Sequence, residues 1–251
     1  FALSGDGFTV IMDYYRDSED GQAQSDLNRL MDGTFSNQEA GMPEGTVHSE
    51  LLRRPGKLYV LASHFHPDHF NKEVLQWREQ RPDIIYIFSK DILRHRRAQK
   101  EDAVWLKKGE EYKDETLSVR AFGSTDVGVS FLLQASGKKI FHAGDLNNWH
   151  WMDESTEAEW KGAEKNFLHE LDDLYAYTPE VDVAMFPVDP RLGKEYMRGA
   201  GQFVTKIKTH IFVPMHFTPE YAKANAFRDF AEAHGVRFVS LTHRGQKIEI
   251  E

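Results

Sequence analysis

The sequence contains no cysteine among its 251 residues. This absence excludes a disulfide framework and every thiolate metal site, so a bound metal would have to use histidine, aspartate or glutamate. It also excludes a cysteine nucleophile, and no G-x-S-x-G stretch offers an activated serine. A phosphate-binding P-loop and a glycine-rich dinucleotide fingerprint are absent as well.

Long apolar runs are also missing, and none approaches the length that crosses a membrane. No segment resembles a signal peptide, and because the chain opens inside a predicted strand at residues 1–3, we expect a short native segment before it. A cytoplasmic location is the plain expectation. With 40% hydrophobic and 12% aromatic residues, the chain can build a substantial core, and we expect residues 1–251 to form a single domain.

An excess of positive charge is absent, because 31 Lys and Arg residues face 40 Asp and Glu residues and the formal net charge is −9. This balance disfavours an extended nucleic-acid surface and favours a small-molecule substrate. The one basic patch is interpreted as a solvated face, because runs of charge usually face water. It comprises Arg94, His95, Arg96, Arg97 and Lys100, followed by Lys107 and Lys108.

Short apolar and β-branched runs alternate with amphipathic segments, which predicts the α/β class with mixed strand and helix units. We expect strands at residues 1–3, 8–15, 58–62, 84–88, 117–122, 127–134, 138–143, 181–187, 209–217, 236–241 and 246–250. We expect helices at residues 23–31, 72–80, 91–99, 156–174, 199–208 and 219–234, the first of them inside a polar loop over residues 16–50.

The densest chemistry lies in the stretch Ser63-His64-Phe65-His66-Pro67-Asp68-His69-Phe70, directly after the buried strand 58–62. Residues two apart in an extended segment point the same way, so His64 and His66 can face one point. The turn at Pro67 can bring the side chains of Asp68 and His69 to a second point. Imidazole nitrogen and carboxylate oxygen are the usual ligands of zinc and similar ions, so this loop is a candidate metal site.

Other polar residues also follow predicted strands. Asp145 follows strand 138–143 beside a glycine, and His216 lies at the end of strand 209–217. Open α/β sheets place their sites at this edge. Asp13, near the end of strand 8–15, is either a partner that orients a metal-binding histidine or a cap of the strand.

These residues resemble the metallo-β-lactamase-fold hydrolases. His64-Phe65-His66-Pro67-Asp68-His69 matches the family's H-x-H-x-D-H signature, and Gly144-Asp145, the late His216 and Asp13 match further landmarks. The resemblance implies a four-layer αβ/βα sandwich with metals at one edge. The branch that it favours contains ascorbate-6-phosphate lactonase and similar cytoplasmic hydrolases.

The resemblance also implies a ligand set. By analogy, His64 and His66 hold a first metal, Asp68, His69 and His216 hold a second, and Asp145 bridges the two. The expected cofactor is one or two Zn²⁺ ions, with Mn²⁺ or Fe as alternatives.

The sequence departs from the family at one position. A third histidine normally serves the first metal, but Ser124 stands in its place. Asp126, two residues on, is a candidate replacement ligand. The alternatives are a weakened first site, a single metal, or rescue by His142 or His150. His142 lies three residues before Asp145 on a strand, hence on the opposite face, so we interpret it as a core residue or a partner of a ligand.

The function that follows is hydrolysis by a metal-activated water, acting on an ester, lactone or phosphoester of a small, anionic substrate. Asp68 is the predicted proton shuttle, while Arg191 and His150 are candidate substrate contacts. Two alternatives stay open: a member that binds metal or ligand without turnover, and a phosphodiesterase or nuclease. A homo-oligomer is also open, through the early acidic loop or the helix at 156–174.

Overall fold

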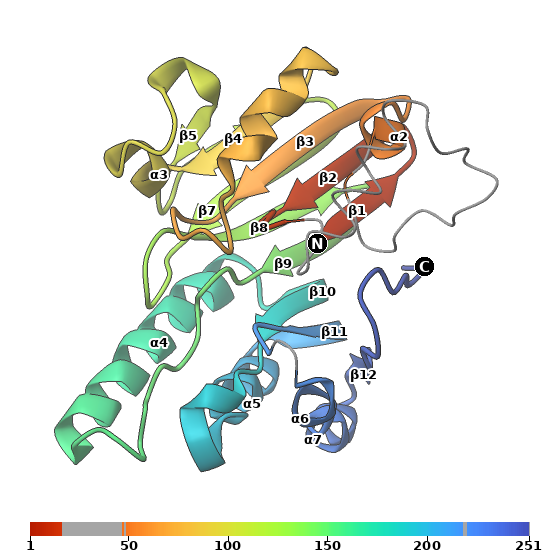
Figure 1. Cartoon of the computed structure of the whole chain (residues 1–251). Coiled ribbons are helices and arrows are strands. Elements are labelled where there is room, and N and C mark those ends of the chain that lie inside the picture. The colour runs from red at the N-terminus through yellow and green to blue at the C-terminus, as the bar shows by residue number, and fades with distance from the viewer. Residues whose placement is uncertain (17–46, 48, 218–219, 251) are drawn as a thin grey trace.

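The computed structural model describes residues 1–16, 47, 49–217 and 220–250. Two β-sheets pack face to face, with helices on both outer surfaces (Figure 1). This arrangement is the four-layer αβ/βα sandwich predicted from the sequence. The predicted helix at 23–31 lies outside the described residues.

The first sheet has the order β1-β2-β3-β4-β5. Its strands are β1 (Ala2–Gly5), β2 (Phe8–Met12), β3 (Lys57–Ala62), β4 (Ile85–Ser89) and β5 (Val104–Leu106). Strands β2 to β5 run parallel, and only β1 is antiparallel to its neighbour. The carboxyl ends of β2 and β3 therefore meet at one edge, where the histidine-rich loop begins.

The second sheet has the order β12-β11-β10-β9-β8-β7-β6. It contains β6 (Glu111–Lys113), β7 (Leu117–Phe122), β8 (Ser130–Ala135), β9 (Lys138–His142), β10 (Glu180–Pro187), β11 (Lys208–Met215) and β12 (Arg237–Phe238). Strands β9 to β12 are parallel, whereas β6 to β9 form an antiparallel meander. The ends of β9, β10 and β11 thus lie side by side.

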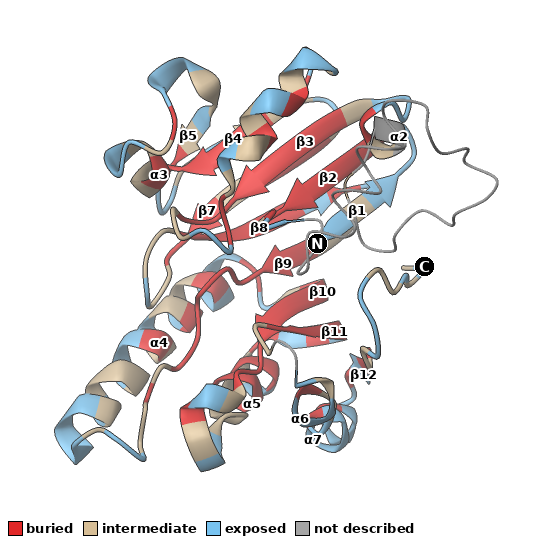
Figure 2. Ribbon diagram, viewed as in Figure 1, coloured by how far each residue is buried: buried red, intermediate tan, exposed pale blue. Residues whose placement is uncertain are grey.

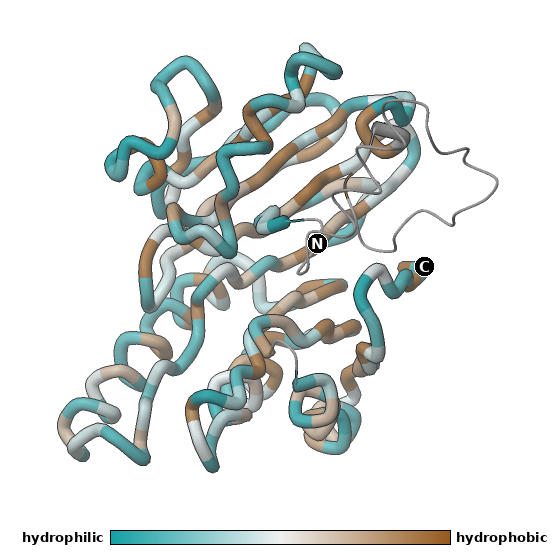
Figure 3. The backbone as a smooth tube through the Cα atoms, in the orientation of Figure 1, coloured by the Kyte–Doolittle hydropathy of each residue, from teal (hydrophilic) through white to brown (hydrophobic). Residues whose placement is uncertain are grey.

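The main core fills the space between the sheets and continues beneath the helices of the second sheet. A smaller apolar cluster covers the outer face of the first sheet. Buried residues follow the central strands, while β1 is largely exposed (Figure 2). Hydrophobic residues run along the strands of both sheets, and hydrophilic residues dominate the outer surface of α4 (Figure 3).

The helices within the described residues are α2 (Ser49–Leu52), η1 (Lys72–Glu79), α3 (Lys90–Arg94), η2 (Lys100–Asp102), α4 (Glu157–Tyr177), η3 (Pro190–Glu195), α5 (Arg198–Lys206), α6 (Tyr221–Asn225) and α7 (Arg228–Ala233). The longest, α4, begins with a capping box between Thr156 and Glu159. No described helix is long and apolar enough to cross a membrane.

Several predicted elements differ from the structure. The helix predicted at 72–80 is a 3₁₀ helix, in which Val74 and Trp77, three residues apart, share the buried face. The helix predicted at 91–99 stops after Arg94, because Arg96 takes a left-handed conformation. The predicted helix 219–234 is two short helices, and strand 246–250 does not form.

Candidate functional site

The predicted ligands meet where strands of both sheets end. His64, His66, Asp68 and His69 lie on the loop after β3, Asp145 follows β9, and His216 follows β11. Parallel pairing of β9, β10 and β11 brings the last two within one cluster with the loop.

Asp145 is the centre of this cluster. Its Oδ2 lies 3.3 Å from His64 Nε2, and its Oδ1 lies 3.1 Å from His69 Nε2. The same Oδ1 is 3.3 Å from His216 Nε2. One carboxylate thus faces histidines from both sheets, as a bridging ligand must.

Three overlapping groups have donor atoms within 4.8 Å of one another. They are His64 with His69 and Asp145, Asp68 with His69 and His216, and His66 with Asp126 and Asp145. Every ligand predicted from the sequence belongs to at least one group, and so does Asp126.

Ser63 and Asp13 fix the orientation of two of these histidines. Ser63 Oγ donates its one proton to Asp13 Oδ2 at 2.6 Å, so it accepts from His64 Nδ1 at 3.0 Å. Asp13 Oδ2 also accepts from His69 Nδ1 at 2.7 Å. With both Nδ1 atoms engaged on the outside, each Nε2 points inward at Asp145.

Asp189 does the same for His216, which is partly exposed. It follows β10 and accepts from His216 Nδ1 at 2.9 Å. Arg191 in turn donates hydrogen bonds to both carboxylate oxygens of Asp189. Asp189 is buried while the Arg191 side chain is 63% exposed, so the arginine secures the carboxylate from the solvent side.

The histidines of the cluster differ in pKa and therefore in charge. Burial lowers the pKa of His64 to about 4, so this imidazole is neutral at pH 7. Burial also opposes charge on His69, but Asp13 and Asp145 outweigh it and raise the pKa of His69 to about 10. Likewise, Asp145 and Asp189 overcome burial and raise the pKa of His216 to about 9. Without a metal, both rings carry an extra proton that an incoming cation must displace.

The pKa of Asp145 shows the opposite balance. Burial alone would raise it, but the contacts with His216 and His69 hold it well below its usual range. Asp145 is therefore ionised throughout the neutral range.

The donor set fits a divalent cation. His64 Nε2 and Asp145 Oδ1 are two of the eight buried side-chain atoms of the described residues that lack a hydrogen-bond partner. Buried polar atoms are usually satisfied, and two unsatisfied ligand-type atoms within one His/Asp cluster are consistent with a metal site.

Asp126 belongs to the group with His66 and Asp145, and its Oδ2 lies 4.0 Å from His66 Nδ1. Both side chains are partly exposed, so either can adjust its rotamer at little cost. Ser124 Oγ accepts from the backbone N–H of Asp126 and supports the loop. Asp126 as the replacement ligand stays a proposal.

His142 and His150 occupy separate environments. His142 is buried, with Nε2 3.8 Å from Asp13 Oδ2, next to the support of the cluster. His150 is also buried, and its ring nitrogens bond to the backbone of Glu195 and Met152. The structure therefore does not present the His150 ring to a substrate.

The basic patch is exposed at Arg94, His95, Arg96 and Lys100, as predicted. The patch nevertheless contacts the histidine loop, because His95 stacks on Phe65 of that loop at a centroid distance of 3.7 Å. Asp91 Oδ2 accepts from the N–H of Phe65, which ties α3 to the histidine loop.

Gly128 allows another loop to approach the histidines closely. A Cβ atom there would lie 2.1 Å from Ser63 O and 2.5 Å from His64 Cβ, and its φ is +75°. Gly137, in the turn between β8 and β9, has a φ of +74° but no atom within 4 Å of a built Cβ.

Gly128→Ala is expected to lower the free energy of unfolding in denaturant titrations by about 2–4 kcal/mol. About 1–2 kcal/mol comes from the left-handed backbone and the rest from the clash. Gly137→Ala is the control and loses only the backbone part. Equal losses in the two variants would show that the contact with the histidine loop is not tight.

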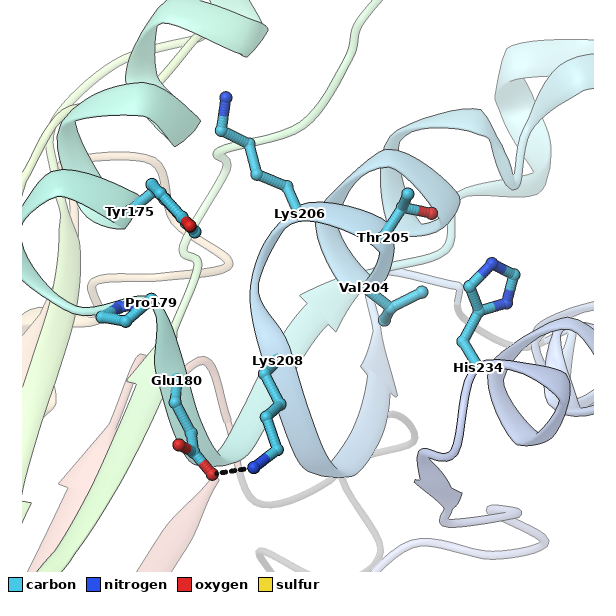
Figure 4. Close-up of a pocket in the computed structure, with 8 residues that line it drawn as sticks. All are labelled: Tyr175, Pro179, Glu180, Val204, Thr205, Lys206, Lys208 and His234. Atoms are coloured by element: carbon cyan, nitrogen blue, oxygen red, sulfur yellow. Dashed lines mark ion pairs between the residues drawn. The ribbon is translucent and has the colours of Figure 1, made fainter.

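A hollow of about 440 Å³ lies elsewhere (Figure 4). Glu180 and Lys208, the first residues of β10 and β11, line it and form a 2.8 Å ion pair. The cluster lies at the opposite ends of these strands. This hollow therefore takes no part in the chemistry at the cluster.

The fold and the cluster together define a metallo-β-lactamase-fold protein with a candidate His/Asp metal site. Residues 43–217 match the family described as the beta-lactamase superfamily domain. The chain therefore belongs to the beta-lactamase superfamily. The comparison with curated proteins gives no match.

Solved structures share the fold at low sequence identity. One is Igni18, described as a novel metallo hydrolase from Ignicoccus hospitalis, with a TM-score of 0.61, 14% identity, and coverage of 98% of this chain and 92% of that one. A possible metal-dependent hydrolase from Veillonella parvula has a TM-score of 0.56, 12% identity and coverage of 98% and 94%. YhfI from Bacillus subtilis, a metallo-beta-lactamase fold protein, has a TM-score of 0.57, 11% identity and coverage of 98% and 88%. The lactonase-like branch stays a prediction.

Proposed function

We propose that the protein is a metal-dependent hydrolase that cleaves an ester, lactone or phosphoester of a small, anionic substrate. The observation that carries this proposal is a set of three overlapping His/Asp groups, two of which include Asp145, while His69 and His216 of the third also face its carboxylate. Two proteins that share the fold are described as a metallo hydrolase and a possible metal-dependent hydrolase, which agrees with this proposal.

His64, His66 and Asp126 would hold a first metal, His69, His216 and Asp68 a second, and Asp145 would face both. This combination of histidine and aspartate ligands suits Zn²⁺, and Mn²⁺ or Fe are alternatives. A bound metal supplies a water of lowered pKa and a positive charge that polarises the substrate.

Asp68 supplies the proton transfer. Its side chain is 57% exposed, and its Oδ2 lies 3.6 Å from His69 Nε2. A carboxylate at the mouth of the cluster can accept the proton of the attacking water and deliver it to the leaving group. Asp13, Ser63 and Asp189 hold the imidazoles still, so that no reorganisation is needed during the reaction.

Arg191 supports the preference for an anionic substrate. Its Nε and Nη2 are engaged by Asp189, and Nη2 also lies 3.3 Å from His216 Nδ1. The Nη1 group has no described partner, and the exposed guanidinium can bind a carboxylate or phosphate beside the cluster. The acyl or phosphoryl group would then lie between Arg191 and Asp68.

The proposal is tested with p-nitrophenyl acetate, a γ-lactone and bis-p-nitrophenyl phosphate, using protein purified without chelator. We expect at least one to be hydrolysed, with the rate lost after chelation and restored by Zn²⁺. Protein that binds Zn²⁺ but hydrolyses none of them would favour a binder without turnover. Hydrolysis that survives chelation would contradict a role for metal.

A further inference from the structure

A second hollow, of about 390 Å³, lies between α4 and the loops beside the metal cluster. Its walls include Thr125, Trp149, Glu159, Gly162 and Asn166. The volume falls in the range of small-molecule sites. Unlike the hollow in Figure 4, it has walls that adjoin residues of the cluster.

Trp149 forms the first shared wall. Its ring meets the ring of His216 edge to face at a centroid distance of 5.5 Å. Its Nε1 donates to the backbone oxygen of Asp145 at 2.9 Å. The indole is therefore held in place by two predicted ligands and forms a rigid surface next to them.

Thr125 forms the second shared wall. It directly precedes Asp126, whose carboxylate faces His66. The Thr125 hydroxyl bonds to the backbone of Asn147 on both sides, as donor to the oxygen and as acceptor from the N–H at 3.0 Å. A group seated in the hollow thus lies beside both halves of the cluster.

Gly162 keeps the hollow open. It lies inside the 21-residue helix α4, where a glycine costs about 1 kcal/mol relative to alanine. A Cβ atom built on Gly162 meets nothing within 4 Å, so no neighbour requires the glycine. The helix forgoes stability at a position where a larger side chain would enter this space.

The residues that line the hollow indicate which kind of ligand can bind there. The described residues that line the hollow include no cation and a single carboxylate, that of Glu159, which accepts from the backbone N–H and hydroxyl of Thr156. The indole of Trp149 offers a flat surface for stacking. The Asn166 amide offers a donor and an acceptor on the exposed side.

We propose that this hollow holds a flat, uncharged ring of the substrate while the cluster acts on the group attached to it. The inference rests on the proposed function and adds a substrate class: ring-bearing esters, lactones or phosphoesters. Gly162 then determines specificity by its missing side chain.

The test compares the binding of 2-naphthoate and acetate to the zinc-loaded protein by isothermal titration calorimetry. Both probes carry a carboxylate for the cluster, and only one carries a ring. We expect naphthoate to bind at least 10-fold more tightly. Gly162→Leu should remove this preference and leave acetate binding unchanged, whereas Lys165→Leu, an exposed position on the same helix, should retain it.

Leucine favours helix and fits the open space, so Gly162→Leu should unfold at the same temperature as the parent or higher. Equal binding of the two probes by the parent, or a ring preference that persists in Gly162→Leu, would overturn the proposal. Ring binding that Gly162→Leu removes, without any acetate binding, would support the hollow and count against the metal-centred function.

Discussion

Asp68→Asn is expected to lower turnover by about 10²–10⁴-fold, the usual contribution of a positioned acid or base. Asparagine keeps the shape of the side chain but cannot take a proton from water. Because the Asp68 side chain is 57% exposed, its stability cost should stay within about 0.5 kcal/mol. Rates and denaturant unfolding of the same preparation measure both quantities.

Asp68 is also a predicted ligand, so metal content must be measured alongside the rate. A variant that retains its metal and loses turnover identifies proton transfer as the main role. Asp83→Asn is the matched control, because Asp83 is an exposed aspartate that pairs with Arg81 before the first residue of β4, at the opposite edge of the sheet. A wild-type rate in Asp68→Asn would rule out the proton shuttle.

Asp13→Asn is expected to lower metal affinity about 10–100-fold while the protein stays folded. The Asp13 carboxylate accepts from His69 Nδ1, which leaves Nε2 facing Asp145. The asparagine amide would instead donate to Nδ1, which moves the ring proton to Nε2 and blocks the ligand atom. Asparagine also tolerates the φ of +47° at this position.

The matched control is Asp114→Asn. Asp114 is likewise a largely buried carboxylate, which accepts from Lys57 and Tyr59 near the start of β3. Its replacement should lower stability without changing metal affinity. Competition titrations with a chromogenic chelator measure affinity. Equal affinities for Asp13→Asn and the parent protein would show that Asp13 only caps its strand.

The sequence carries a clearer signal for the candidate site than for the elements that surround it. A six-residue motif predicts four candidate ligands because its residues are adjacent in the chain, and the structure brings them into the groups that could hold a metal. Asp145 and His216 are predictable for a more general reason: each follows a buried strand, and parallel strands end at the same edge. This rule also points to Asp189, which follows β10, but only the structure shows that it orients His216.

Tertiary contacts decide the remainder. Nothing in the pattern marks Ser63 as the partner of His64, because this role depends on Asp13 from another strand. The pattern places His150 near the pocket, but the backbone of Glu195 holds the ring in the interior. Strands β5 and β6 have three residues each and carry too short a pattern to predict.

Metal content per chain, measured by elemental analysis on protein purified without chelator, tests the central claim most directly. We expect two metals in the parent protein and one in Asp126→Ala, because Asp126 would complete the first site with His66. Turnover should fall with the lost metal. One metal or none in the parent, unchanged in Asp126→Ala, would contradict a two-metal centre completed by Asp126.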